Sequence, residues 1–209
     1  MDMHILSHAK KLIEAGFSVI PADKASKRPM VSWKIFQTRQ STLEEWTRWE
    51  TLAADGIGVV TGAVSGNLVM LDFDQRGKVF KEWFLKIPVT LREKLVMETS
   101  QSGGVHVIFR TETAPKGNRK FAFDENGVLI ETRGEGGYFV CAPTQGYEFV
   151  QGDFLSVQRL TQEEEAILYD VAKSFHRESV GAGSARPGGM AEGLSTRGTG
   201  RARASFVLS

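Results

Sequence analysis

Patterns typical of helices and of strands alternate along residues 1–178, and this order restricts the chain to a mixed α/β or α+β domain. Helical spacing of apolar residues and capping signals predict helices at residues 5–13, 42–49, 78–86 and 161–176. Alternating or continuous apolar runs predict strands at residues 17–20, 56–62, 67–74, 94–99, 105–110, 128–132 and 137–142. We expect Trp46 and Trp49, on the second helix, to belong to the core.

The composition of the chain changes at residue 181. Residues 181–209 contain seven glycines, scattered serines and arginines, and few large apolar residues before Phe206. Such a segment buries too little apolar surface to offset the conformational entropy that is lost on folding. We therefore expect one folded domain over residues 1–178 and a Gly/Ser/Arg-rich disordered tail or linker over residues 179–209.

Charge is balanced over the whole chain but not along it. The 209 residues carry a formal net charge of +1, so no global field indicates a nucleic-acid partner. Residues 1–40, however, hold seven basic side chains against three acidic ones. This segment is either a solvated face or a phosphate-binding surface, and its composition leaves both interpretations open.

The chain has one cysteine, Cys141, which excludes an intrachain disulfide and a Cys-rich zinc site. No apolar run approaches the length of a membrane span. Lys10, Lys11 and Glu14 interrupt any apolar signal-peptide segment at the N-terminus. These features predict a cytoplasmic protein with no membrane partner.

Two carboxylates end a strongly apolar predicted strand, Leu68-Val-Met-Leu-Asp72-Phe-Asp74. Side chains alternate between the faces of a strand, so Asp72 and Asp74 point the same way, with Cα atoms about 7 Å apart. Such a pair repels unless a cation lies between its members, and Mg²⁺ and Mn²⁺ prefer oxygen ligands. The alternative is a pair of solvated acids that open a turn before Gly77.

A glycine turn that leads into a strand with a histidine is the second signal, in Ser100-Gln-Ser102-Gly103-Gly104-Val-His106-Val-Ile-Phe109. Glycines remove side-chain bulk, so the backbone N–H groups of this turn can approach a phosphate. A lone histidine on a strand is usually structural. His106 shares its strand face with Arg110, which favours a phosphate contact.

The predicted strand at residues 128–132 carries an acid among apolar residues. Glu131 and Arg133 lie on one face of this strand, and Glu135 follows in a glycine-rich turn, where we expect it to be exposed to solvent. Glu131 is either half of an ion pair with Arg133 on an edge strand or part of an acidic site. Both interpretations remain open for this strand in isolation.

The three signals together form a sharper hypothesis. If the three strands are neighbours in one sheet, their carboxylates can hold two cations while the basic side chains meet phosphate oxygens. Positioning and charge neutralisation of this kind are what phosphoryl transfer requires. The residues concerned are Asp72, Asp74, Glu131, His106, Arg110 and Arg133.

The order of these motifs resembles the bifunctional primase-polymerase family of the archaeo-eukaryotic primase superfamily, which occurs in plasmid, phage and mobile-element replication proteins. The resemblance rests on Asp-x-Asp, then Ser-Gly-Gly-x-His, then an acid before Arg-Gly-x-Gly-Gly-Tyr-x-x-x-x-Pro. An N-terminal series also matches: Ile-Pro21, Lys27-Arg28-Pro29, Trp33 with Gln37, Trp46, and Gly58-Val-Val-Thr-Gly62. The resemblance covers residues 10–150, and only the combined pattern is specific.

The resemblance implies an archaeo-eukaryotic primase fold, with an RRM-like catalytic sheet packed against an N-terminal α/β unit. It implies Asp72, Asp74 and Glu131 as the catalytic ligands of a two-metal Mg²⁺ or Mn²⁺ site, and His106 as a nucleotide-phosphate contact. The further nucleotide-binding candidates are Ser102, Gly103 and Gly104 in the phosphate-facing turn, together with Arg110, Arg133 and Lys27.

The sequence therefore predicts a template-dependent DNA primase/polymerase domain, which is a nucleotidyltransferase. Its expected partners are single-stranded or primed DNA, (d)NTPs and a helicase in cis or in trans. A metal-dependent nuclease or phosphodiesterase is the second hypothesis, because it uses a similar acidic site without a triphosphate contact. A non-catalytic replication module that binds DNA or a helicase is the third. Clustered carboxylates argue against it, because their repulsion costs stability.

Overall fold

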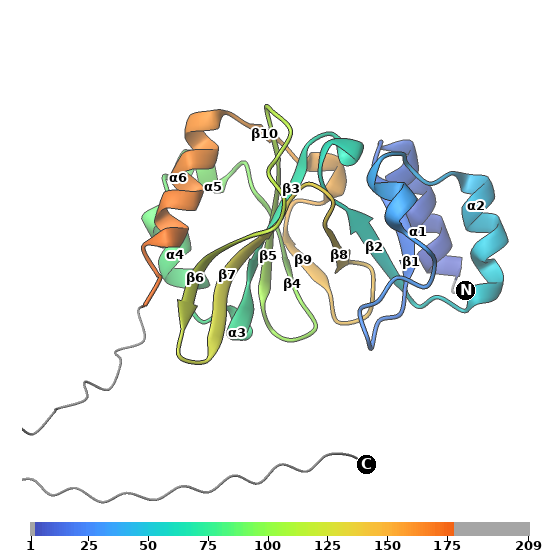
Figure 1. The fold of residues 1–209 in the computed structure, drawn as a ribbon, viewed down its shortest axis with the longest axis horizontal. Helices are drawn as coiled ribbons and strands as arrows, with labels where there is room; N and C mark the ends of the chain where they lie inside the picture. Colours follow the sequence, from blue (N-terminus) through green and yellow to red (C-terminus); the bar gives the residue numbers. More distant parts are fainter. Residues whose placement is uncertain (1–2, 178–209) are drawn as a thin grey trace, which may run out of the picture. The chain divides into compact units, whose positions relative to one another are not determined.

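The computed structural model describes residues 3–177, and in this range the chain forms ten strands and six α-helices (Figure 1). The strands are β1 (Ser18–Ala22), β2 (Gly56–Val60), β3 (Leu68–Phe73), β4 (Val96–Thr99), β5 (Val105–Thr111), β6 (Arg119–Asp124), β7 (Gly127–Arg133), β8 (Tyr138–Cys141), β9 (Glu148–Gln151) and β10 (Arg159–Leu160). The helices are α1 (Met3–Glu14), α2 (Leu43–Arg48), α3 (Asp74–Gly77), α4 (Phe80–Lys86), α5 (Val89–Arg92) and α6 (Gln162–Lys173).

These strands form two sheets. The smaller sheet has the order β1-β2-β8, and the larger, seven-stranded sheet has the order β6-β7-β3-β5-β4-β9, with β10 paired to β5. Within the described residues the pairing is antiparallel except between β10 and β5. The mixed α+β class predicted from the sequence is confirmed, whereas the primase-type arrangement of the larger sheet stays a prediction.

The larger sheet separates two hydrophobic cores, and alternate residues of β3 serve them. Val69, Leu71 and Phe73 pack into a core that α4, α5 and α6 complete. Leu68 and Met70 face the other way, into a core built with α1 and the three-stranded sheet. Asp72 follows Met70 on the same face of β3, so its carboxylate lies at the end of this second core.

The residues predicted to cap the helix ends form the expected contacts. Thr42 and Thr161 both form capping boxes, with Glu45 and Glu164 respectively. Gly16 adopts a φ of 85° directly after α1, a backbone conformation that glycine reaches without strain. Trp46 is fully buried and donates its indole N–H to the Val19 carbonyl, which confirms its place in the core.

The structure differs from the sequence-based expectations at several elements. The strands β6, β9 and β10 lie in segments where none was predicted. β1 continues through Pro21 to Ala22, because this strand is at an edge of its sheet and Pro21 needs no partner for a backbone N–H. The strand of the two acids ends at Phe73, and Asp74 begins the short helix α3.

The absence of a membrane span and the domain boundary were also predicted from the sequence. Among the described residues, no helix has both the length and the apolar character that crossing a bilayer requires. The predicted domain boundary after residue 178 and the tail at 179–209 lie outside the described residues.

Candidate metal and nucleotide site

Five neighbouring strands each contribute one polar residue to a row across the larger sheet. Directly opposed residues on paired strands have their side chains on the same face. The register aligns β6 with β7, β7 with β3, β3 with β5, and β5 with β4 at one level of the sheet. The resulting row is Lys120, Glu131, Asp72, His106 and Glu98.

Three carboxylates gather at the middle of this row. One oxygen from each of Asp72, Asp74 and Glu131 lies within 4.8 Å of the others. Burial raises the pKa of Asp72 to about 6, and the nearby charges of Asp74 and Glu131 act in the same direction. The negative charges of these carboxylates repel one another, and a hard divalent cation such as Mg²⁺ or Mn²⁺ would relieve this repulsion.

A tight backbone turn follows the second acid. Gln75 and Arg76 adopt φ values of 52° and 61°, in the left-handed region that costs a non-glycine residue roughly 1–2 kcal/mol. The Gln75 side chain donates to Asp124 Oδ1 at 2.8 Å and to the Val128 carbonyl at 3.3 Å. These two bonds hold α3 against the β6–β7 hairpin, so they fix Asp74 beside the strand that carries Glu131.

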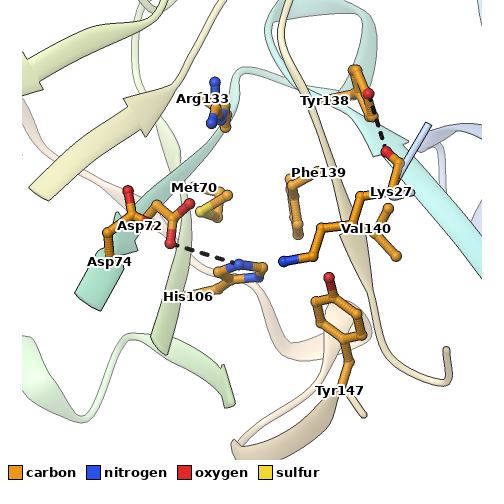
Figure 2. Close-up of a pocket in the computed structure, with 10 residues that line it drawn as sticks. All are labelled: Lys27, Met70, Asp72, Asp74, His106, Arg133, Tyr138, Phe139, Val140 and Tyr147. Atoms are coloured by element: carbon orange, nitrogen blue, oxygen red, sulfur yellow. Dashed lines mark hydrogen bonds and ion pairs between the residues drawn. The ribbon is translucent and has the colours of Figure 1, made fainter. Parts of the chain in front are cut away.

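His106 lies between two carboxylates. Its Nδ1 is 2.7 Å from Glu98 Oε1, and its Nε2 is 3.8 Å from Asp72 Oδ1, as the dashed line in Figure 2 marks. Burial by itself lowers the pKa of His106. The hydrogen bond with Glu98 and the charges of Glu98 and Asp72 outweigh burial, so its pKa is raised above the ordinary value.

Glu98 was not among the predicted site residues. Its side chain is fully buried, and its second oxygen accepts the Ala142 N–H at 3.0 Å. Glu98 therefore fixes the ring of His106 and ties β4 to the turn after β8. The signal available in the sequence was a lone acid inside the apolar strand predicted at residues 94–99.

A cavity of about 280 Å³ opens on the His106 side of the acids (Figure 2). It is lined by Lys27, Met70, Asp72, Asp74, His106, Arg133, Tyr138, Phe139, Val140 and Tyr147. Figure 2 shows the Lys27 ammonium group directed toward His106, and the Lys27 Nζ lies 6.0 Å from the Tyr147 ring centroid. The Lys27 carbonyl accepts the Tyr138 hydroxyl at 3.1 Å, which anchors this loop to β8.

The other predicted nucleotide contacts lie at different distances from this cavity. Arg133 lines it and donates to Glu131 Oε1, so Glu131 is ion-paired and also belongs to the acid cluster. The expectation of an edge strand is wrong, because β7 lies between β6 and β3. Arg110 lies at the far end of β5, about 13 Å along the strand from His106. Its guanidinium stacks on the Phe17 ring and does not line the cavity.

The glycine turn supports the acids from outside the cavity lining. The Gly103 N–H is used within the turn, donating to the Ser100 carbonyl at 2.8 Å, and Ser102 Oγ lies 3.2 Å from Ser100 Oγ. A Cβ on Gly104 would lie 2.7 Å from the Phe73 carbonyl oxygen. Glycine at this position therefore lets the turn pack directly against the end of β3, next to Asp74.

The family model described as bifunctional DNA primase/polymerase, N-terminal, matches residues 9–163, which is more than half of the 209-residue chain. No curated protein matches the chain. The matched range contains every residue of the acid cluster and of the cavity lining.

Proposed function

The chain belongs to the bifunctional DNA primase/polymerase family, as an N-terminal domain of that type, and from this membership we propose that it joins nucleotides on a DNA template. Membership implies a nucleotidyltransferase, whose substrates are DNA and nucleotides. The observation that carries the proposal is the acid cluster beside a cavity with basic side chains. A site with this pairing can bind divalent cations and a triphosphate together.

The donor set fits a pair of divalent cations. Asp72, Asp74 and Glu131 supply carboxylate oxygens, the ligand type that Mg²⁺ and Mn²⁺ prefer. When bound, such ions lower the pKa of an attacking hydroxyl and neutralise charge on the phosphates. The chain itself supplies the ligand positions, which the pairing of β3 with β7 and the turn at α3 hold fixed.

The basic side chains of the cavity suit a nucleotide triphosphate. His106 presents Nε2 toward Asp72 and the cavity, because Nδ1 is held by Glu98. Lys27 reaches the same space from the loop before α2. We propose that His106 and Lys27 bind the phosphates that leave as pyrophosphate, with Arg133 at the margin between nucleotide and acids. A nuclease would not need the triphosphate contact that this pair of basic side chains can supply.

The proposed partners follow from the same activity. The template is single-stranded or primed DNA, and a helicase in cis or in trans would supply single strands. Replication of a phage, a plasmid or another mobile element is the proposed setting. These assignments extend the family membership and do not depend on any further feature of the site.

Primer extension tests the proposed function. The full chain should extend a labelled primer on a DNA template with dNTPs in Mg²⁺ or Mn²⁺, and EDTA should abolish the product. Asp72→Ala and Asp74→Ala should each remove incorporation, whereas Asp170→Ala, which changes an exposed acid of α6, should leave it intact. Degradation of the primer without dNTP-dependent extension would instead identify the nuclease, and full activity of Asp72→Ala would remove the two-metal proposal.

A further inference from the structure

The position of the cavity sets a direction for the reaction. Phosphoryl transfer places the attacking and leaving oxygens roughly in line on opposite sides of the transferred phosphorus. The cavity lies on the His106 side of the acids; it reaches β7 at Arg133, but its lining includes neither Glu131 nor Lys120. With pyrophosphate leaving toward His106 and Lys27, the attacking hydroxyl must approach from the other side, past Glu131 toward Lys120 on β6.

Lys120 is the last residue of the polar row on the side from which the hydroxyl would attack. It lies on β6 directly opposite Glu131, two strand spacings or about 10 Å from Asp72 between Cα atoms. Its side chain is exposed and forms no ion pair or hydrogen bond within residues 3–177. The nearest acid in the row, Glu131, is paired with Arg133, which leaves the charge of Lys120 without a partner in the part of the chain that the structure describes.

The residues around Lys120 in the sequence are also positively charged. Residues 113–123 contain three basic side chains and no acid, in a chain whose net charge is only +1. Arg119 lies over the Phe121 and Tyr169 rings on the α6 side of the sheet, which leaves Lys116 and Lys120 for a ligand on this side.

β6 is also the end strand of the larger sheet. The Arg177 N–H donates to the Phe123 carbonyl at 2.9 Å, so a ligand beside Lys120 approaches the other end of the strand, near Arg119. A polyanion with phosphates spaced at about 3.4 Å along its axis matches an exposed lysine at this strand end.

We propose that the β6 edge binds the primer strand, with Lys120 contacting a phosphodiester close to the primer 3′ end. This inference rests on the proposed polymerase function and adds the path of one substrate strand. An exposed lysine on an edge strand also discourages pairing with other chains. That role predicts no change in DNA binding when the lysine is removed, so an experiment separates the two.

The test compares Lys120→Ala with Lys81→Ala in the full chain. Lys81 is an exposed lysine on α4, which packs on the opposite face of the larger sheet, so it controls for the loss of one positive charge. For Lys120→Ala we expect the Kd for primed DNA to rise about fivefold and the slope of log affinity against log salt to fall by about 1. The nucleotide KM at saturating primed DNA should stay at the wild-type value. Lys81→Ala should change the Kd less than about twofold.

The same position allows a direct measurement of the strand path. Lys120→Cys should form a disulfide, by exchange that releases a small thiol, with a primer that carries an activated mixed-disulfide tether on one of its last phosphodiesters, more readily than with the same tether on the template strand. Equal Kd values for wild type and Lys120→Ala, an equal loss in Lys81→Ala, or cross-linking mainly to the template would each overturn the inference. Failure of the wild-type chain to extend any primer would instead refute the proposed function, so the two failures are distinguishable.

Discussion

Asp72 holds a proton more tightly in the folded protein than in the unfolded chain, because burial raises its pKa to about 6. Folding of the metal-free protein therefore takes up a proton between about pH 4 and pH 6. The contribution of Asp72 to stability is full below this window and is lost as the pH rises through it. We expect Asp72→Asn to remove this fall in the free energy of unfolding, measured by urea denaturation at a series of pH values.

A matched control uses an acid in a different setting. Asp170→Asn changes an exposed carboxylate that pairs with Lys173 on α6, so it should leave the decline between pH 4 and pH 6 intact. Parallel stability curves for wild type and Asp72→Asn would show that Asp72 is not the group that titrates.

The sequence predicted which acids meet but not what holds the histidine. Asp72, Asp74 and Glu131 could be assigned because each interrupts or ends an apolar strand, and the family motifs place them in order. Glu98 could not be assigned, since its function depends on the register that sets it opposite His106. Arg110 was grouped with His106 by strand face alone, and the length of β5 then separates the two.

In the turn before β5, close packing against β3 requires a glycine at position 104. A Cβ on Gly104 would lie 2.7 Å from the Phe73 carbonyl and 3.0 Å from Ser100 Oγ, and the first of these is backbone that cannot rotate away. We expect Gly104→Ala to lower the free energy of unfolding by about 1–3 kcal/mol. Thermal and urea denaturation measure this change.

Gly117 is the comparison within the same chain. A Cβ there would have its nearest neighbour at 3.8 Å, so Gly117→Ala should change stability by less than about 0.5 kcal/mol. Equal stability of the two variants would mean that the turn moves freely away from β3.

Elements with strong periodicity or caps were predicted well, and the edges of the sheet were not. The strands β3, β5 and β7 are central and apolar, so their sequences identify them. β6 and β9 are the two ends of the main strand order, where one side of each strand has no partner. Their residues alternate less clearly because fewer of them are buried, and the basic run in β6 suggests a loop when it is taken alone.

At the scale of the whole molecule, the acid cluster connects segments that are far apart in the sequence. Asp72 and Asp74 lie on β3 and α3, whereas Glu131 comes from β7, so a bound cation would tie these elements together. A ligand that binds only the folded state raises stability, by about 2.7 kcal/mol at a concentration of 100 Kd. We expect Mn²⁺ to raise the Tm of the full chain without DNA or nucleotide, and EDTA to reverse the effect.

The variant that tests this linkage is Asp74→Asn. It should melt at or above the wild-type temperature without metal, because repulsion within the cluster is relieved, and should lose most of the response to Mn²⁺. An unchanged Mn²⁺ response in this variant would assign the stabilising ion to another site.

The division of β3 between two cores has a consequence for how the protein avoids inactive forms. Shifting the strand by one residue would exchange its faces, sending Asp72 into the core under α4 and α6 and exposing Phe73. Burying a carboxylate there costs several kcal/mol even when it takes up a proton, which is a large share of the roughly 5–15 kcal/mol that stabilise a domain. Misaligned, catalytically dead copies are therefore strongly disfavoured, because the same register that buries Phe73 places the acids on the correct side.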